Sequence, residues 1–173
     1  MKTVRILQTL LPVGILAATA VGGTEIEVIY SEVAESPTSL VPGLINARFD
    51  SFDRPFRSPD SMRWVITASS DLPTSEDEVL ITGMGTVGML QVREGTTAEW
   101  APAEAVGALD TDLGLNDAGQ YVFATNTDGP SDADEYIILG DIVNDTFTVV
   151  AQEGQDVPGF KGIEAYGSTL NSP

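Results

Sequence analysis

The sequence predicts an all-β protein made of tandem four-stranded antiparallel units of the propeller-blade type, forming a partial propeller. Two observations carry this prediction: an internal repeat, and short runs of aromatic and β-branched residues closed by turn residues. Residues 60–83 align without a gap on residues 117–140, and eight of the 24 positions are identical. Chance alone would give about one or two identities, so we take the repeat as real.

The predicted strands follow the same order in both copies of the repeat. In the first copy they cover residues 45–56, 62–68, 78–82 and 87–93, and in the second copy residues 106–113, 120–125, 135–139 and 146–152. Turns rich in Asp, Pro, Ser and Gly separate them. Residues 98–109 are rich in alanine, but Pro102 and Gly107 disfavour a helix there.

The repeat also predicts the organisation of the chain. The motif VREG at residues 92–95 returns as AQEG at residues 151–154. We therefore expect a signal peptide at residues 1–20, a strand completing a preceding unit at 21–32, one unit at 33–91, a second at 92–150, and the incomplete start of a third at 151–173. A propeller closes with about 4–8 blades, so the chain is either a fragment of a longer protein, which we favour, or an open stack.

The N-terminus has the order of features found in secretory signal peptides. Lys2 and Arg5 precede an uncharged stretch at residues 6–23, and the small-residue pattern Ala18-Thr19-Ala20 predicts cleavage near Ala20. No second apolar stretch follows, so we expect no membrane insertion of the mature chain. The predicted location is periplasmic, cell-surface or extracellular.

Composition excludes several classes of function. The chain has 26 Asp and Glu against 8 Lys and Arg, a formal charge of −18, which becomes −20 without Lys2 and Arg5. Such a surface repels nucleic acid. The absence of His and Cys rules out a Ser-His-Asp triad, thiol catalysis, and zinc sites built on these residues.

These exclusions favour a non-catalytic binding, adhesion or structural module whose partner is a protein or a carbohydrate. The alternative is a secreted hydrolase of the glycosidase type, which would use a pair of carboxylates on the propeller scaffold. With 26 acidic residues, sequence spacing identifies no particular pair.

One segment of the second unit carries a family resemblance. Residues 115–123 read LNDAGQYVF, followed by VAQEG at 150–154 and VPG at 157–159. They resemble secreted bacterial proteins, common in planctomycetes and myxobacteria, whose propeller-like repeats carry LNDAGQVAF and then VAREGDPAPG. The resemblance covers residues 28–173 and implies export and architecture, but no activity. The first unit departs from it: residues 58–63 keep the aspartate and lose the glycine.

Acidic turns are the candidate metal ligands. Carboxylates concentrated in loops suit Ca²⁺, which takes about 6–8 oxygen ligands. No EF-hand spacing is present, and solvated acidic turns explain the same pattern. The candidate calcium ligands are Asp71, Glu76 and Asp77 in the first unit and Asp128, Asp132 and Asp134 in the second. No other cofactor is expected.

A contrasting patch of arginines and aromatic residues lies at residues 45–64. Such residues can stack on sugars or bind carboxylates. The candidate binding residues are Arg48, Arg54, Arg57 and Trp64. Alternatively, the aromatic rings fill a sheet interface and the arginines pair with neighbouring acids.

Overall fold

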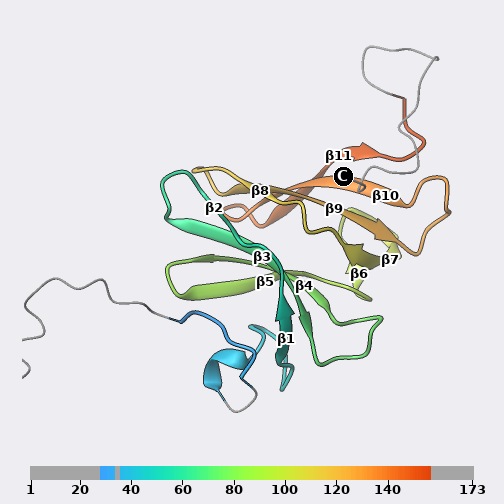
Figure 1. Cartoon of the computed structure of the whole chain (residues 1–173). Helices are drawn as coiled ribbons and strands as arrows, with labels where there is room; N and C mark the ends of the chain where they lie inside the picture. Colours follow the sequence, from blue (N-terminus) through green and yellow to red (C-terminus); the bar gives the residue numbers. More distant parts are fainter. Residues whose placement is uncertain (1–27, 34–35, 157–173) are drawn as a thin grey trace, which may run out of the picture.

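The computed structural model describes residues 28–33 and 36–156, which form two antiparallel β-sheets (Figure 1). The predicted signal peptide and all but the first six residues of the predicted third unit lie outside the described residues. Within residues 28–33 and 36–156, no helix has the length and apolar composition needed to cross a bilayer.

The first sheet is a four-stranded meander whose first strand is broken in two. A single 3-10 turn, η1 (Pro37–Ser39), precedes it. The sheet order is β1-β3-β4-β5, and β2 pairs with the other end of β3. Its strands are β1 (Phe49–Phe52), β2 (Phe56–Arg57), β3 (Arg63–Ser70), β4 (Glu78–Met84) and β5 (Val87–Arg93).

The second sheet repeats this layout. Its order is β11-β10-β9-β7-β6, and β8 pairs with β9 as β2 pairs with β3. The strands are β6 (Thr97–Ala98), β7 (Ala101–Leu109), β8 (Gly114–Leu115), β9 (Gln120–Thr127), β10 (Glu135–Asp141) and β11 (Thr146–Gln152). The all-β fold with tandem antiparallel, partly propeller-like units is thus confirmed.

The two sheets also share their register. Trp64 lies opposite Gly83 in the first sheet, and Tyr121 lies opposite Gly140 in the second. A β-bulge in the last strand recurs. In the first sheet β5 bulges opposite Leu80 and Ile81 of β4, and in the second sheet β11 bulges opposite Ile137 and Ile138 of β10. The last hairpin is two residues longer in the second sheet, which explains why the repeat spacing grows from 57 to 59.

Packing explains why the repeat keeps a glycine in its third strand. A Cβ on Gly83 would lie 2.1 Å from the Trp64 ring, and one on Gly140 would lie 2.2 Å from the Tyr121 ring. The aromatic ring in each unit therefore occupies the space of the missing side chain, and no other residue fits without moving the ring.

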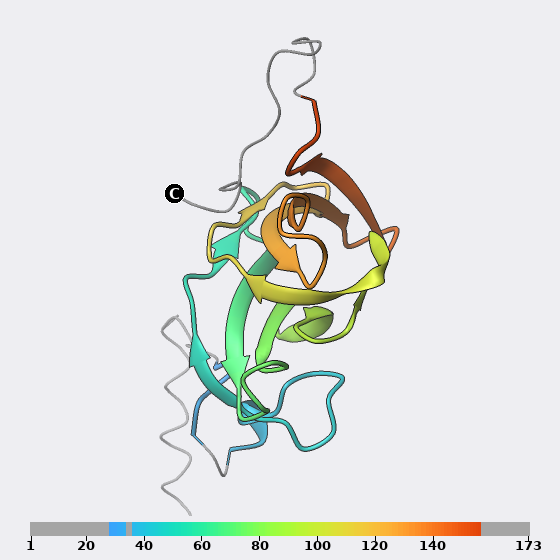
Figure 2. The ribbon, with the colours of Figure 1, turned by 90° about the vertical axis from the view of Figure 1, so that its right-hand side faces the viewer.

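Two apolar clusters hold the molecule together. One joins the sheets: Val65, Leu80 and Val92 of the first sheet lie in the same cluster as Tyr121 and Phe123 of the second. The other covers the opposite face of the first sheet, where Val41, Ala47, Phe49, Trp64, Ala68, Val79 and Ile81 are buried. Figures 1 and 2 show the resulting order: the N-terminal segment (blue), then the first sheet (green), then the second sheet (yellow to orange).

The N-terminal segment differs from the sequence prediction. Residues 28–33 form no strand, so the prediction of a strand there was wrong; residues 21–27 lie outside the described part. The segment is held by side-chain packing instead, because the Tyr30 ring lies 4.9 Å from the Phe49 ring and 5.9 Å from the Trp64 ring, between centroids.

Candidate functional site

The signature turn of the second unit is built by its own side chains. Asn116 Oδ1 accepts hydrogen bonds from the N–H groups of Ala118 and Gln120, at 3.0 and 2.9 Å. Gly119 supplies the positive φ, at 90°, that closes the turn.

The first unit makes the same kind of turn with different residues. Ser58 Oγ accepts the N–H of Arg63 at 3.0 Å, and Ser61 takes a positive φ of 61°. The loss of the signature glycine therefore does not remove the turn, because a neighbouring serine adopts the left-handed conformation.

The two turns contact each other across the junction of the sheets. Asp117 Oδ1 accepts the backbone N–H of Asp60 at 2.7 Å, and Arg63 Nη1 donates to the Asp117 carbonyl oxygen at 2.7 Å. The signature aspartate thus joins one unit to the preceding unit.

Two of the candidate calcium ligands bind backbone. The Asp71 carboxylate accepts the N–H of Arg48 at 2.8 Å, and the Asp128 carboxylate accepts the N–H of Ala105 at 2.6 Å. Each aspartate also donates its own N–H to the carbonyl oxygen of the same partner. These carboxylates tie the loop after the second strand of each unit to the first strand.

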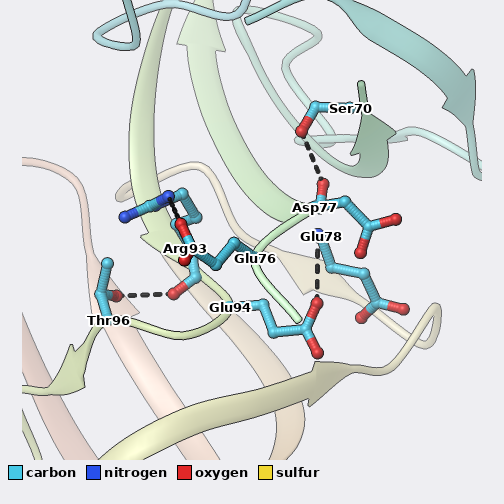
Figure 3. Close-up of polar contacts among 7 residues, drawn as sticks. All are labelled: Ser70, Glu76, Asp77, Glu78, Arg93, Glu94 and Thr96. Carbon is cyan, nitrogen blue, oxygen red and sulfur yellow. Dashed lines mark hydrogen bonds and ion pairs between the residues drawn. The ribbon is translucent and has the colours of Figure 1, made fainter. Parts of the chain in front are cut away.

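The other two candidate ligands of the first unit, Glu76 and Asp77, lie in the β3–β4 loop (Figure 3). Glu76 forms an ion pair with Arg93, with 2.7 Å between Oε2 and Nη1. The Asp77 carbonyl oxygen accepts hydrogen bonds from the Ser70 N–H and Oγ. In the second unit, the Asp134 carbonyl oxygen accepts the Thr127 N–H, and Asp132 lies in the equivalent loop.

No three acidic side chains in residues 28–33 and 36–156 are grouped so as to hold a metal ion. The six candidate ligands are therefore spread over turns in the described structure. Calcium binding stays a prediction.

Burial perturbs the protonation of two glutamates at the junction between the sheets. It raises the pKa of Glu78, against the opposing hydrogen bond that Glu78 Oε2 accepts from the Leu109 N–H at 2.5 Å. Burial also raises the pKa of Glu94, whose carboxylate accepts the Glu78 N–H at 3.4 Å (Figure 3). Both carboxylates thus accept hydrogen bonds from backbone N–H groups at the junction between the sheets.

The candidate binding residues of the predicted patch do not form one site, because they lie in three different places. Arg57 and Trp64 line a groove of about 520 Å³, together with Val28, Ile29, Tyr30, Phe52, Pro55 and Ile66. Arg54 lies over the Phe56 ring, 5.5 Å from its centroid. Arg48 instead bonds to Ser36 and Ser39.

The groove is apolar with one cation at its edge. The Trp64 side chain is 6% exposed and its Nε1 donates to the Gly85 carbonyl oxygen at 2.8 Å, so it serves packing. The described residues that line the groove include no carboxylate. The paired acids that a glycosidase needs are therefore not among them.

A second surface was missed by the sequence reasoning. Val122 pairs with Leu139, and Ala124 pairs with Ile137, so these four side chains share one face of the second sheet. This outer face lies opposite the face that carries Tyr121 and Phe123. Val122 is 36% exposed, and Ile137 and Leu139 are half-buried.

The repeat shows what is unusual about the outer face. Its counterparts in the first sheet, 57 residues earlier, are Val65, Thr67, Leu80 and Thr82, which are 0, 2, 0 and 0% exposed. They are covered because the second unit packs on them. The two sets alternate in the same way in the sequence, so the difference between them is seen only in their burial.

Comparison with protein-family models, with curated proteins and with solved structures gives no match to this chain.

Proposed function

We propose that the protein is an exported, non-catalytic structural or binding module, and that it binds its partner through the outer face of the second sheet. The observation that carries the proposal is the contrast between Val65, which is fully buried, and its counterpart Val122, which is 36% exposed. Full burial of an aliphatic side chain contributes about 1.5–3 kcal/mol, so covering the outer face would stabilise a complex.

Export is supported by the order of charged, apolar and small residues in the first 20 positions. A binding role is supported by how the acidic residues are used. Asp71, Asp117 and Asp128 accept backbone hydrogen bonds, Glu76 forms an ion pair, and the groove-lining residues include no carboxylate. These contacts favour a module that joins β-units over the alternative of a carboxylate-dependent hydrolase.

The chain offers a direct test because it contains no cysteine. Val122→Cys places a single thiol on the outer face, and Thr74→Cys places a matched control in an exposed loop of the first unit. Each variant is labelled with a thiol reagent twice: on the cells that export it, and after purification at high dilution.

We expect Cys at position 122 to be protected on the cells and reactive after purification, with the control reactive in both settings. Equal reactivity of the two thiols on the cells would mean that nothing covers the outer face, and the proposal would be wrong.

A further inference from the structure

Within the described residues, the outer face and the groove correspond, through the repeat, to the two sides of the contact between the sheets. We propose that the partner covering the outer face is a second copy of this chain, bound head to tail, with the groove of one copy on the outer face of the next. This inference rests on the proposed function and names its partner.

The contact between the two sheets supplies the template. On one side of it lie Val65, Leu80 and Val92 of the first sheet. On the other side lie Leu109, Tyr121 and Phe123 of the second unit, which are 7, 1 and 1% exposed. A further contact of the same kind needs both surfaces again.

The first of these surfaces recurs as the outer face. Val122, Ile137 and Ala151 stand where Val65, Leu80 and Val92 stand in the first sheet, since each lies opposite the equivalent partner in the strand pairing. These counterparts are apolar like their template; Val122 is 36% exposed, Ile137 is half-buried and Ala151 is 3% exposed.

The second surface recurs as the groove. Phe52, Trp64 and Ile66 lie 57 residues before Leu109, Tyr121 and Phe123, and all three line the groove. Phe52 and Ile66 are half-buried, whereas their counterparts are buried against the first sheet. The groove is thus the part that stays open of the face equivalent to the one on which the first sheet packs in the second unit. The rest of this face is covered by the N-terminal segment: Trp64, Val79 and Ile81 are 6, 0 and 0% exposed and pack with Tyr30 and Val41.

The two ends lie on opposite sides of the stack. Figures 1 and 2 place the N-terminal segment and the first sheet at one end and the strands β9 to β11 at the other. The two surfaces therefore cannot meet within one copy in this arrangement, and a second copy can supply each with its complement.

The polar contacts at the junction can also repeat. Within the chain, the Asp60 N–H donates to the Asp117 carboxylate, and Arg63 donates to the Asp117 carbonyl oxygen. In a head-to-tail pair, the Asp117 N–H of one copy faces the Asp60 carboxylate of the next. Gln120, the counterpart of Arg63, retains a side-chain amide that can donate to the Asp60 carbonyl oxygen.

Such an interface is heterologous, so it builds either a closed ring or an open filament. If the two sheets of the described residues count as two blades, two to four copies would supply the about 4–8 blades of a propeller. The formal charge of −18 opposes association, so we expect added salt to strengthen it.

The test is sedimentation equilibrium of the purified protein at high salt, over about a hundredfold range of concentration. Val122→Glu disables the outer face and Ile66→Glu disables the groove. Arg57→Glu is a milder groove variant, because Arg57 is exposed. If Ile66→Glu lowers the melting temperature, the result for Arg57→Glu decides the test of the groove. Thr74→Glu is the control for added charge.

We expect the wild type and the control to reach at least twice the monomer mass, and each interface variant alone to stay monomeric. Mixing a face variant with a groove variant should restore a dimer of one copy each, and nothing larger, because one intact junction remains.

Two results would overturn the inference. One is a wild type that stays monomeric at every concentration. The other is a groove variant that assembles like the wild type while the face variant does not, which would indicate a face-to-face dimer. In either case, protection of the thiol at position 122 on cells would leave the proposed function standing with a different partner.

Discussion

The carboxylate of Asp117 accepts a hydrogen bond from the backbone N–H of Asp60, 2.7 Å away, across the junction between the two sheets. The two residues are 57 positions apart, which is the spacing of the repeat. The turn signature therefore has a second role besides closing its own turn, since it fixes the position of one unit on the preceding one.

Asp117→Ala removes this acceptor and leaves the Asp60 N–H without its partner. We expect a loss of about 0.5–1.5 kcal/mol in the free energy of unfolding, measured with urea. Asp117→Asn keeps an oxygen at the same place and should lose less. If both variants match the wild type, the contact does not hold the units together.

Gly83→Ala and Gly140→Ala test the packing of the aromatic rings. The added Cβ would lie 2.1 Å from the Trp64 ring or 2.2 Å from the Tyr121 ring, so the ring must move. We expect each variant to lose about 1–3 kcal/mol of stability in thermal or urea unfolding.

The matched control for these variants is Gly85→Asn. Gly85 has a positive φ of 58°, which Asn tolerates, and nothing lies within 4 Å of its Cβ position. Its stability should stay within about 0.5 kcal/mol of the wild type. Because Gly85 lies in the β4–β5 turn and its Cβ position contacts neither ring, a loss as large as that of Gly83→Ala would contradict the explanation by ring packing.

Glu78→Gln tests the buried carboxylate at the junction. Because burial raises the pKa of Glu78, the folded state favours the protonated form. The stability that the protonated Glu78 carboxyl contributes is therefore complete below the usual pKa of 4.5. It is lost as the pH rises through the raised pKa of the folded state. Glutamine stays neutral and keeps an oxygen for the Leu109 N–H.

We therefore expect the stability of Glu78→Gln, measured by urea unfolding, to fall less than that of the wild type as the pH rises above 4.5. Glu99→Gln removes one charge from an exposed position and controls for the reduced net charge. Parallel pH profiles for the wild type and Glu78→Gln would contradict the buried role of this carboxylate.

Asp71→Ala separates a structural aspartate from a calcium ligand. Loss of the hydrogen bond from the Arg48 N–H should cost about 1 kcal/mol of stability, equally in added calcium and in chelator. A melting temperature that falls with the substitution in calcium, but not in chelator, would instead identify Asp71 as a metal ligand.

Much of the fold could be predicted from the repeat because the repeat preserves the pairs that pack. Trp64 with Gly83 and Tyr121 with Gly140 keep the same pairing because ring and glycine fit each other. The turn at Ser58 was harder to predict. The first unit lacks the glycine that gives the second unit its positive φ at Gly119, and Ser61 adopts a positive φ instead.

The candidate sites were less predictable than the strands. Asp71 and Asp128 occupy acidic turns in the sequence, but their role depends on a backbone N–H 23 residues away, which sequence spacing does not show. The outer face was missed because Val122 alternates like any half-buried strand residue. Its exposure becomes apparent when it is compared with the burial of Val65.

Val65→Glu and Val122→Glu make the same change at equivalent positions of the two sheets. Val65 is 0% exposed in the contact between the sheets, so a charge there should prevent folding or cost several kcal/mol. Val122→Glu should keep the wild-type melting temperature at high dilution, where the outer face is open. Thermal unfolding followed by circular dichroism distinguishes the two.

We propose that the outer face of the second sheet, which the described residues leave partly open, is an interface between units. The most direct measurement is the mass of the wild type and of Val122→Glu by sedimentation equilibrium at high salt. The account predicts association of the wild type and a monomeric, equally folded variant. Equal masses for the two proteins at every concentration would contradict it.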